Sequence, residues 1–206
     1  MEDYNEIQVI ELLIDEDNEW GGINAISIVE NPAIQEDFIA LSKDESIKLA
    51  EVDTERKILM GAALIPDKKI IRMNENGKYY IYFSKETVEK ASQLFLSRGK
   101  QNNSTLEHEV EIGGLSVVES WIIEDDVHDK SRKYGLNMPV GTWMVSVKVN
   151  NDQIWEEYVK TQKVKGFSIE GYFADALERP QEDIEEELAA QEAIKILKDL
   201  LTNIEN

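Results

Sequence analysis

The chain has 206 residues and a formal net charge of −20 at pH 7, with 42 acidic against 22 basic side chains. This charge argues against binding to nucleic-acid phosphates or to an anionic membrane surface, and it suits a basic protein partner. Cysteine is absent, which excludes disulfides, a thiolate nucleophile and cysteine-based metal sites. We expect an intracellular protein, because the acidic start lacks a secretion signal and no apolar run is long enough to span a bilayer.

Alternating or continuous apolar runs predict a mainly β fold for most of the chain. The predicted strands are residues 7–14, 21–29, 57–65, 79–83, 115–123, 142–149 and 164–173. The turn sequence Asn-Glu-Asn-Gly at 74–77 predicts a hairpin. One helix is predicted between a cap at Ser84 and Gly99, and a short one over 154–160. This α+β pattern, dominated by strands, is typical of a barrel or sandwich.

The composition changes after Pro180. From there Ala, Ile and Leu recur at helical spacing among many acidic residues, which predicts an amphipathic helix. We therefore expect a β domain over residues 1–178 and an acidic C-terminal helix over 179–206.

A serine at position 168 stands inside the predicted strand 164–173, between two glycines. A hydroxyl in a buried strand needs a hydrogen-bond partner. Ser168 is then either a core serine bonded to a neighbouring strand or a nucleophile held on a rigid strand.

The chain has two histidines. His128 lies in a charged loop and is interpreted as a solvated loop residue, whereas His108 stands between two glutamates after a short apolar run. His108 is then either a surface histidine whose charged form the two acids stabilise, or a general base. Histidine suits general-base catalysis because its ordinary pKa is close to neutral pH. The sequence shows no metal-ligand spacing and no phosphate-binding loop. The most economical enzyme hypothesis is acyl transfer without metal or cofactor, with Ser168 as nucleophile and His108 as base.

Several segments, taken in order between about residues 7 and 175, together resemble XkdF-type phage proteins. They are residues 26–34, 64–66, 80–84, 102–103, 106–108, 118–121, 135–136, 141–143 and 166–171. That family is regarded as prohead (capsid maturation) serine proteases, and it is more distantly similar to herpesvirus assemblin. The resemblance implies a small β-barrel, closed or partly open, that carries a His on one strand and a Ser on a later one. The matching residues here are His108 and Ser168.

The chain departs from the pattern of the related prohead proteases at one position. In those proteins a strand that ends in Pro-Ala follows the serine and carries the third catalytic residue. Here the similar residues 25–33 lie near the N-terminus, so we hypothesise a circularly permuted barrel. The position that matches the usual acid is Ala25. Glu119 is the first candidate to replace it, followed by Glu30 and Glu170, although Glu119 is equally well interpreted as an outward-facing strand residue.

The resemblance implies a prohead maturation serine endopeptidase that cleaves scaffold protein, capsid-protein extensions and itself. It would act in the host cytoplasm, inside the assembling procapsid, with major capsid and scaffold proteins, the portal and further copies of itself as partners. The C-terminal helix would bind scaffold or portal, or be removed by self-cleavage; alternatively, it packs on the barrel and stabilises it. The alternative is a catalytically inactive capsid-assembly or scaffold-binding protein on the same fold. An unrelated esterase is disfavoured because no Gly-x-Ser-x-Gly sequence surrounds Ser168.

Overall fold

The computed structural model describes residues 8–15, 18, 21–31, 39–41, 56–74 and 77–175, and these are mainly β. The strands are β1 (Val9–Leu13), β2 (Gly22–Val29), β3 (Ile39–Leu41), β4 (Ile58–Leu64), β5 (Ile70–Asn74), β6 (Gly77–Tyr82), β7 (Ser104–Leu106), β8 (Val110–Glu111), β9 (Leu115–Ile122), β10 (Trp143–Val149), β11 (Gly166–Tyr172) and β12 (Ala174–Asp175). The helical segments are α1 (Lys85–Ser97), α2 (Asp152–Ile154), a π turn (Trp155–Val159) and two 3-10 turns (Lys100–Asn102 and Lys130–Tyr134). The predicted mainly β class is confirmed.

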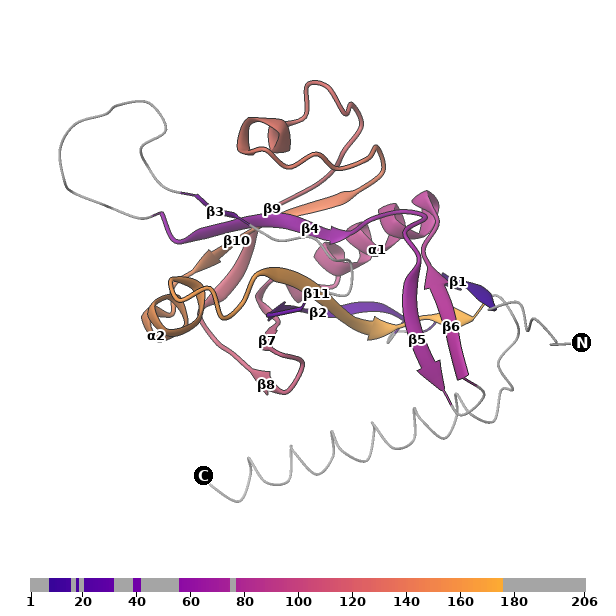
Figure 1. The fold of residues 1–206 in the computed structure, drawn as a ribbon, viewed down its shortest axis with the longest axis horizontal. Helices are drawn as coiled ribbons and strands as arrows, with labels where there is room; N and C mark the ends of the chain where they lie inside the picture. The colour runs from indigo at the N-terminus through magenta and orange to yellow at the C-terminus, as the bar shows by residue number, and fades with distance from the viewer. Residues whose placement is uncertain are drawn as a thin grey trace, which may run out of the picture.

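The strands form three four-stranded sheets in the described part of the chain. Their orders are β12-β1-β6-β5, β3-β4-β10-β9 and β11-β2-β7-β8. Figure 1 shows β2 and β11 side by side across the middle of the molecule, with the β5–β6 hairpin at one end. The predicted hairpin is present, because Asn74 pairs with Gly77, whose φ of +116° is one that other residues rarely adopt.

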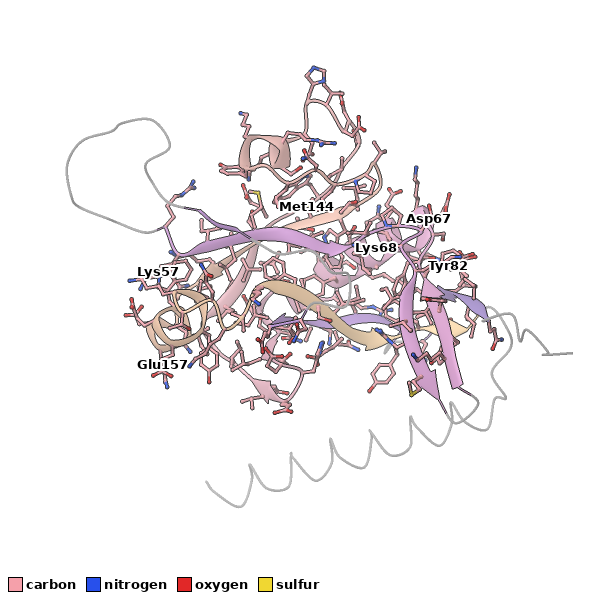
Figure 2. The ribbon with its side chains drawn as sticks, viewed as in Figure 1. Lys57, Asp67, Lys68, Tyr82, Met144 and Glu157 are labelled. Carbon is pink, nitrogen blue, oxygen red and sulfur yellow. The ribbon has the colours of Figure 1, made fainter. Side chains whose placement is uncertain are left out.

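Strands β4 and β10 form the most deeply buried pair. Nearly every residue of both is buried. The sequence of β4 is accordingly apolar throughout, whereas β10 also contains Ser146 and Lys148. Helix α1 packs against β2, β9 and β10. Its Phe95 meets Trp143 of β10 edge-on, with ring centroids 5.5 Å apart. Side chains such as the fully buried Met144 fill the space between the strands (Figure 2).

No closed barrel forms among the described residues, which corrects the closed form expected from the resemblance. Closure requires hydrogen bonds between the two end strands of a sheet, and each of the three sheets instead ends in two edge strands. The predicted helix over 179–206, and with it the domain boundary, lies outside the described residues. In the described ranges, no helix combines the length and the apolar character needed to cross a membrane.

Candidate active site

Ser168 lies on β11 directly opposite Ser27 of β2. Successive side chains of a strand point to opposite faces, so Ser168 and Ser27 share one face of the sheet. The other face carries core residues such as Phe167, which is 1% exposed. Ser168 is 9% exposed, so its hydroxyl sits at the border of the buried region.

His108 lies in the tight turn between β7 and β8, and this turn rests on the end of β2. The His108 N–H donates a hydrogen bond to Ser27 Oγ at 3.1 Å. Ser27 pairs with Thr105 on its other side, so β2 is flanked by Ser168 and by the strand that leads into the His108 turn. The pairing of β7, β2 and β11 thereby brings His108 and Ser168, which are 60 positions apart in the sequence, to one face of one sheet.

Glu170 is the acid that contacts the histidine. It follows Ser168 by two positions on β11 and therefore points to the same face. Its Oε1 lies 3.1 Å from His108 Nδ1, and the same oxygen accepts a hydrogen bond from Thr105 Oγ1. The His108 and Glu170 side chains are 41% and 31% exposed, so solvent and a substrate can reach both.

The arrangement places a hydroxyl, an imidazole and a carboxylate on the same face of the β11-β2-β7 ladder. With Nδ1 directed at Glu170, the Nε2 atom is the ring nitrogen left to exchange a proton. Among the described residues, no hydrogen bond joins Ser168 to His108. Catalytic hydrogen bonds are often long in unliganded enzymes and tighten when substrate binds, so the geometry is compatible with a Ser-His-Glu set.

The structure does not bring Glu119 to this site. Glu119 lies on β9, in a different sheet, where it accepts hydrogen bonds from Lys130 and from Ser146 of β10. Lys130, followed by Ser146, lowers the pKa of this carboxyl below its ordinary value. A catalytic role for Glu119 stays a prediction that this placement does not support.

The two other positions weighed for the acid lie next to the site. Ala25 stands directly across the ladder from Glu170, at the same level of the sheet. Glu30 follows the end of β2, and its backbone N–H donates to the carboxylate of Glu107 at 2.7 Å.

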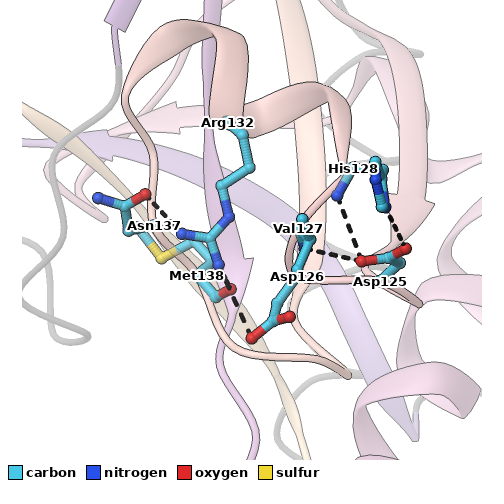
Figure 3. Close-up of polar contacts among 7 residues, drawn as sticks. All are labelled: Asp125, Asp126, Val127, His128, Arg132, Asn137 and Met138. Carbon is cyan, nitrogen blue, oxygen red and sulfur yellow. Dashed lines mark hydrogen bonds and ion pairs between the residues drawn. The ribbon is translucent and has the colours of Figure 1, made fainter.

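His128 lies on the loop between β9 and β10 (Figure 3). Its Nδ1 lies 2.7 Å from Asp125 Oδ2, and its side chain is 82% exposed. This hydrogen bond, with the backbone N–H groups of Val127 and His128, lowers the pKa of Asp125 to about 2. On the same loop, Arg132 binds Asn137 and lies 4.0 Å from Asp126 (Figure 3). These contacts order a surface loop, as expected for a solvated histidine.

A pocket of about 180 Å³ borders Ser168 on the side of the β5–β6 hairpin. Its lining is mostly apolar, with Arg72 as the charged residue. An apolar cavity of 150 Å³ can hold a benzene molecule, so this pocket has room for one apolar side chain. No group of three or more His, Cys, Asp or Glu that could hold a metal ion is found in the described ranges.

Comparison with protein families gives a match that covers the site. The family model described as "Putative phage serine protease XkdF" matches residues 46–178, which is more than half of the chain. The chain belongs to this family. The description indicates a phage serine protease, and the resemblance to XkdF-type proteins is confirmed. The matched residues include Ser168, His108 and Glu170, whereas β2 lies outside them. Comparison with curated proteins and with solved structures gave no significant match.

Proposed function

We propose that this XkdF-family protein is a prohead maturation endopeptidase in which Ser168 is the nucleophile, His108 the general base and Glu170 the acid that orients the histidine. One observation carries the proposal. The His108 ring is bonded through Nδ1 to Glu170, on the same face of β11 as Ser168 and two positions along. A nucleophile, a base and an orienting group within one small area form the set that serine hydrolases need.

In the proposed reaction Ser168 Oγ attacks the carbonyl carbon of the scissile peptide bond while His108 Nε2 takes the hydroxyl proton. The carbon–nitrogen bond then breaks, and His108 returns the proton to the leaving amine. Water, deprotonated by His108, attacks the acyl ester and restores Ser168. Glu170 keeps Nδ1–H as the donor and stabilises the imidazolium that forms in each step.

The position of Glu170 also explains how the site can have an acid although position 25 is an alanine. The acid of the related proteases is expected at position 25 of β2, and Glu170 stands opposite it on β11. A carboxylate that projects from either of two directly paired positions reaches the same region of the sheet face. We infer that β11 supplies the acid that β2 lacks, so that Ser168 and Glu170 belong to the same strand.

Scaffold protein, capsid-protein extensions and the chain itself are the proposed substrates, cut in the host cytoplasm inside the assembling procapsid. A net charge of −20 suits basic segments in such partners. Self-association belongs to the same proposal.

The test is co-expression with the capsid and scaffold proteins of the same phage, with cleavage products identified by mass spectrometry. We expect cleavage by the wild type and by Ser97→Ala, a change of an exposed serine at the end of α1, and none by Ser168→Ala. If every chain stays intact with the wild type while proheads assemble, the alternative of a non-catalytic assembly protein replaces the proposal. The alternative is favoured by Ala25, which stands at the position that matches the usual acid.

A further inference from the structure

The His108 turn has an unusual backbone. Glu107 and His108 have φ angles of +52° and +61°, in the left-handed region. Residues other than glycine adopt this region infrequently, and two in succession are held there only by their surroundings. The direction of the His108 ring depends on these two angles, so whatever holds the turn also aims the ring.

The end of β2 supplies the contacts that hold this turn. The N–H of His108 donates to Ser27 Oγ at 3.1 Å, and the N–H of Glu107 donates to the carbonyl of Ile28 at 3.1 Å. Ser27 is fully buried, and its hydroxyl lies 3.4 Å from the carbonyl of Thr105. Each N–H in the left-handed part of the turn is therefore bonded to β2.

The Glu107 side chain adds the third contact. Its Oε1 accepts the N–H of Glu30 at 2.7 Å, a short hydrogen bond to a charged acceptor. This N–H lies just past the last residue of β2. Glu109, on the other side of His108, is also an exposed glutamate, and no side-chain contact of it is seen among the described residues.

We propose that Glu107 is a positioning residue that, together with Ser27, clamps the His108 turn onto β2 and so aims the imidazole at Glu170 and Ser168. The inference rests on the proposed function for its catalytic consequence. It adds that residues of β2, outside the region matched by the family model, complete the site.

The experiment compares Glu107→Ala, Glu107→Gln and Glu109→Ala on a peptide that the wild type cleaves. Misaligned catalytic groups can cost up to 100-fold, so we expect kcat to fall by roughly tenfold or more in Glu107→Ala, with little change in KM. Glu107→Gln keeps an acceptor for the Glu30 N–H and should recover most of the rate. Glu109→Ala removes the same charge beside His108 without touching the clamp, and we expect near wild-type kcat. Equal losses for Glu107→Ala and Glu109→Ala would show a charge effect and overturn the proposal.

A second measurement does not depend on activity. NMR of the ring N–H of His108 reports its hydrogen bond to Glu170, and we expect this signal to be lost or broadened in Glu107→Ala and Ser27→Ala but kept in Glu109→Ala. Glu107→Ala and Ser27→Ala release the same turn. The fold-decrease in kcat of the double variant should therefore be smaller than the product of the two single-variant decreases. An unchanged signal in Glu107→Ala overturns the proposed clamp. Loss of the signal in a protein whose wild type cleaves nothing would support the clamp and overturn the proposed function.

Discussion

At the scale of single residues, the acid is where sequence and structure differ most. Glu119 was the first candidate because it lies on the strand that follows His108 in the sequence. The structure joins the His108 turn to β2 and β11 instead, so the nearest acid is Glu170. One signal for Glu170 was present in the sequence, since a residue two positions from Ser168 on a strand shares its face. The pairing of β7 with β2, which brings His108 to that face, has no signature in local sequence.

Matched substitutions of the two acids test this difference. Glu170→Gln removes the negative charge that stabilises the histidine, and we expect kcat to fall by up to about 10⁴-fold, as for the same change in a catalytic triad. Glu119→Gln should change kcat by less than about twofold, because its partners are Lys130 and Ser146. Steady-state kinetics on one cleaved peptide measures both. A larger loss for Glu119→Gln than for Glu170→Gln would restore the assignment made from the sequence.

The Asp125–His128 contact gives a prediction on pH. The pKa of Asp125 is lowered from 3.8 to about 2, so its charged form stabilises the folded state. This contribution is present above pH 3.8 and is lost as the pH falls towards 2. We expect His128→Ala to raise the pKa of Asp125 part of the way back, because the backbone N–H groups remain. NMR titration of the Asp125 carboxyl measures it, and a wild-type value near 3.8 would contradict the contact.

At the scale of elements, the sequence predicts strands well where burial shapes the pattern. The seven predicted strands correspond to β1, β2, β4, β6, β9, β10 and β11, and helix α1 begins after Ser84 as expected. Strands β3, β7, β8 and β12 have only two or three residues each, too few for an alternation to be recognised. The order of strands in the sheets depends on long-range pairing, so the strand pattern leaves barrel and sandwich open, and the closed form that the resemblance allowed is not found among the described residues.

We expect Phe95 to be the residue that contributes most to the packing of helix α1 on the sheet. This residue is fully buried against Trp143, so Phe95→Ala should lower the free energy of unfolding by about 3–5 kcal/mol through the cavity that it leaves. Leu96 is the next residue and is 42% exposed, so Leu96→Ala should cost about 1 kcal/mol or less. Urea denaturation measures both. Similar losses for the two variants would mean that α1 does not pack as described.

At the scale of the whole molecule, the region matched by the family model is not expected to fold by itself. Strand β2 lies between β11 and β7, outside residues 46–178. Its Ile23, Ile26 and Ile28 are each at most 3% exposed. Burying one such side chain contributes about 1.5–3 kcal/mol, and the net stability of a domain is about 5–15 kcal/mol. A fragment of residues 46–178 should therefore show poorly dispersed amide NMR signals, whereas a well-dispersed spectrum would contradict the central place of β2.

The most direct test of the account is to identify the residue that reacts with a fluorophosphonate, which modifies serines activated as nucleophiles. The folded full-length chain is labelled, digested and mapped by mass spectrometry, in parallel with His108→Ala. We predict a single label on Ser168 in the wild type and a strong decrease in its rate of formation in His108→Ala, since the base that removes the hydroxyl proton is gone. No label on Ser168, or a label on it that forms equally fast without His108, would contradict the proposed site.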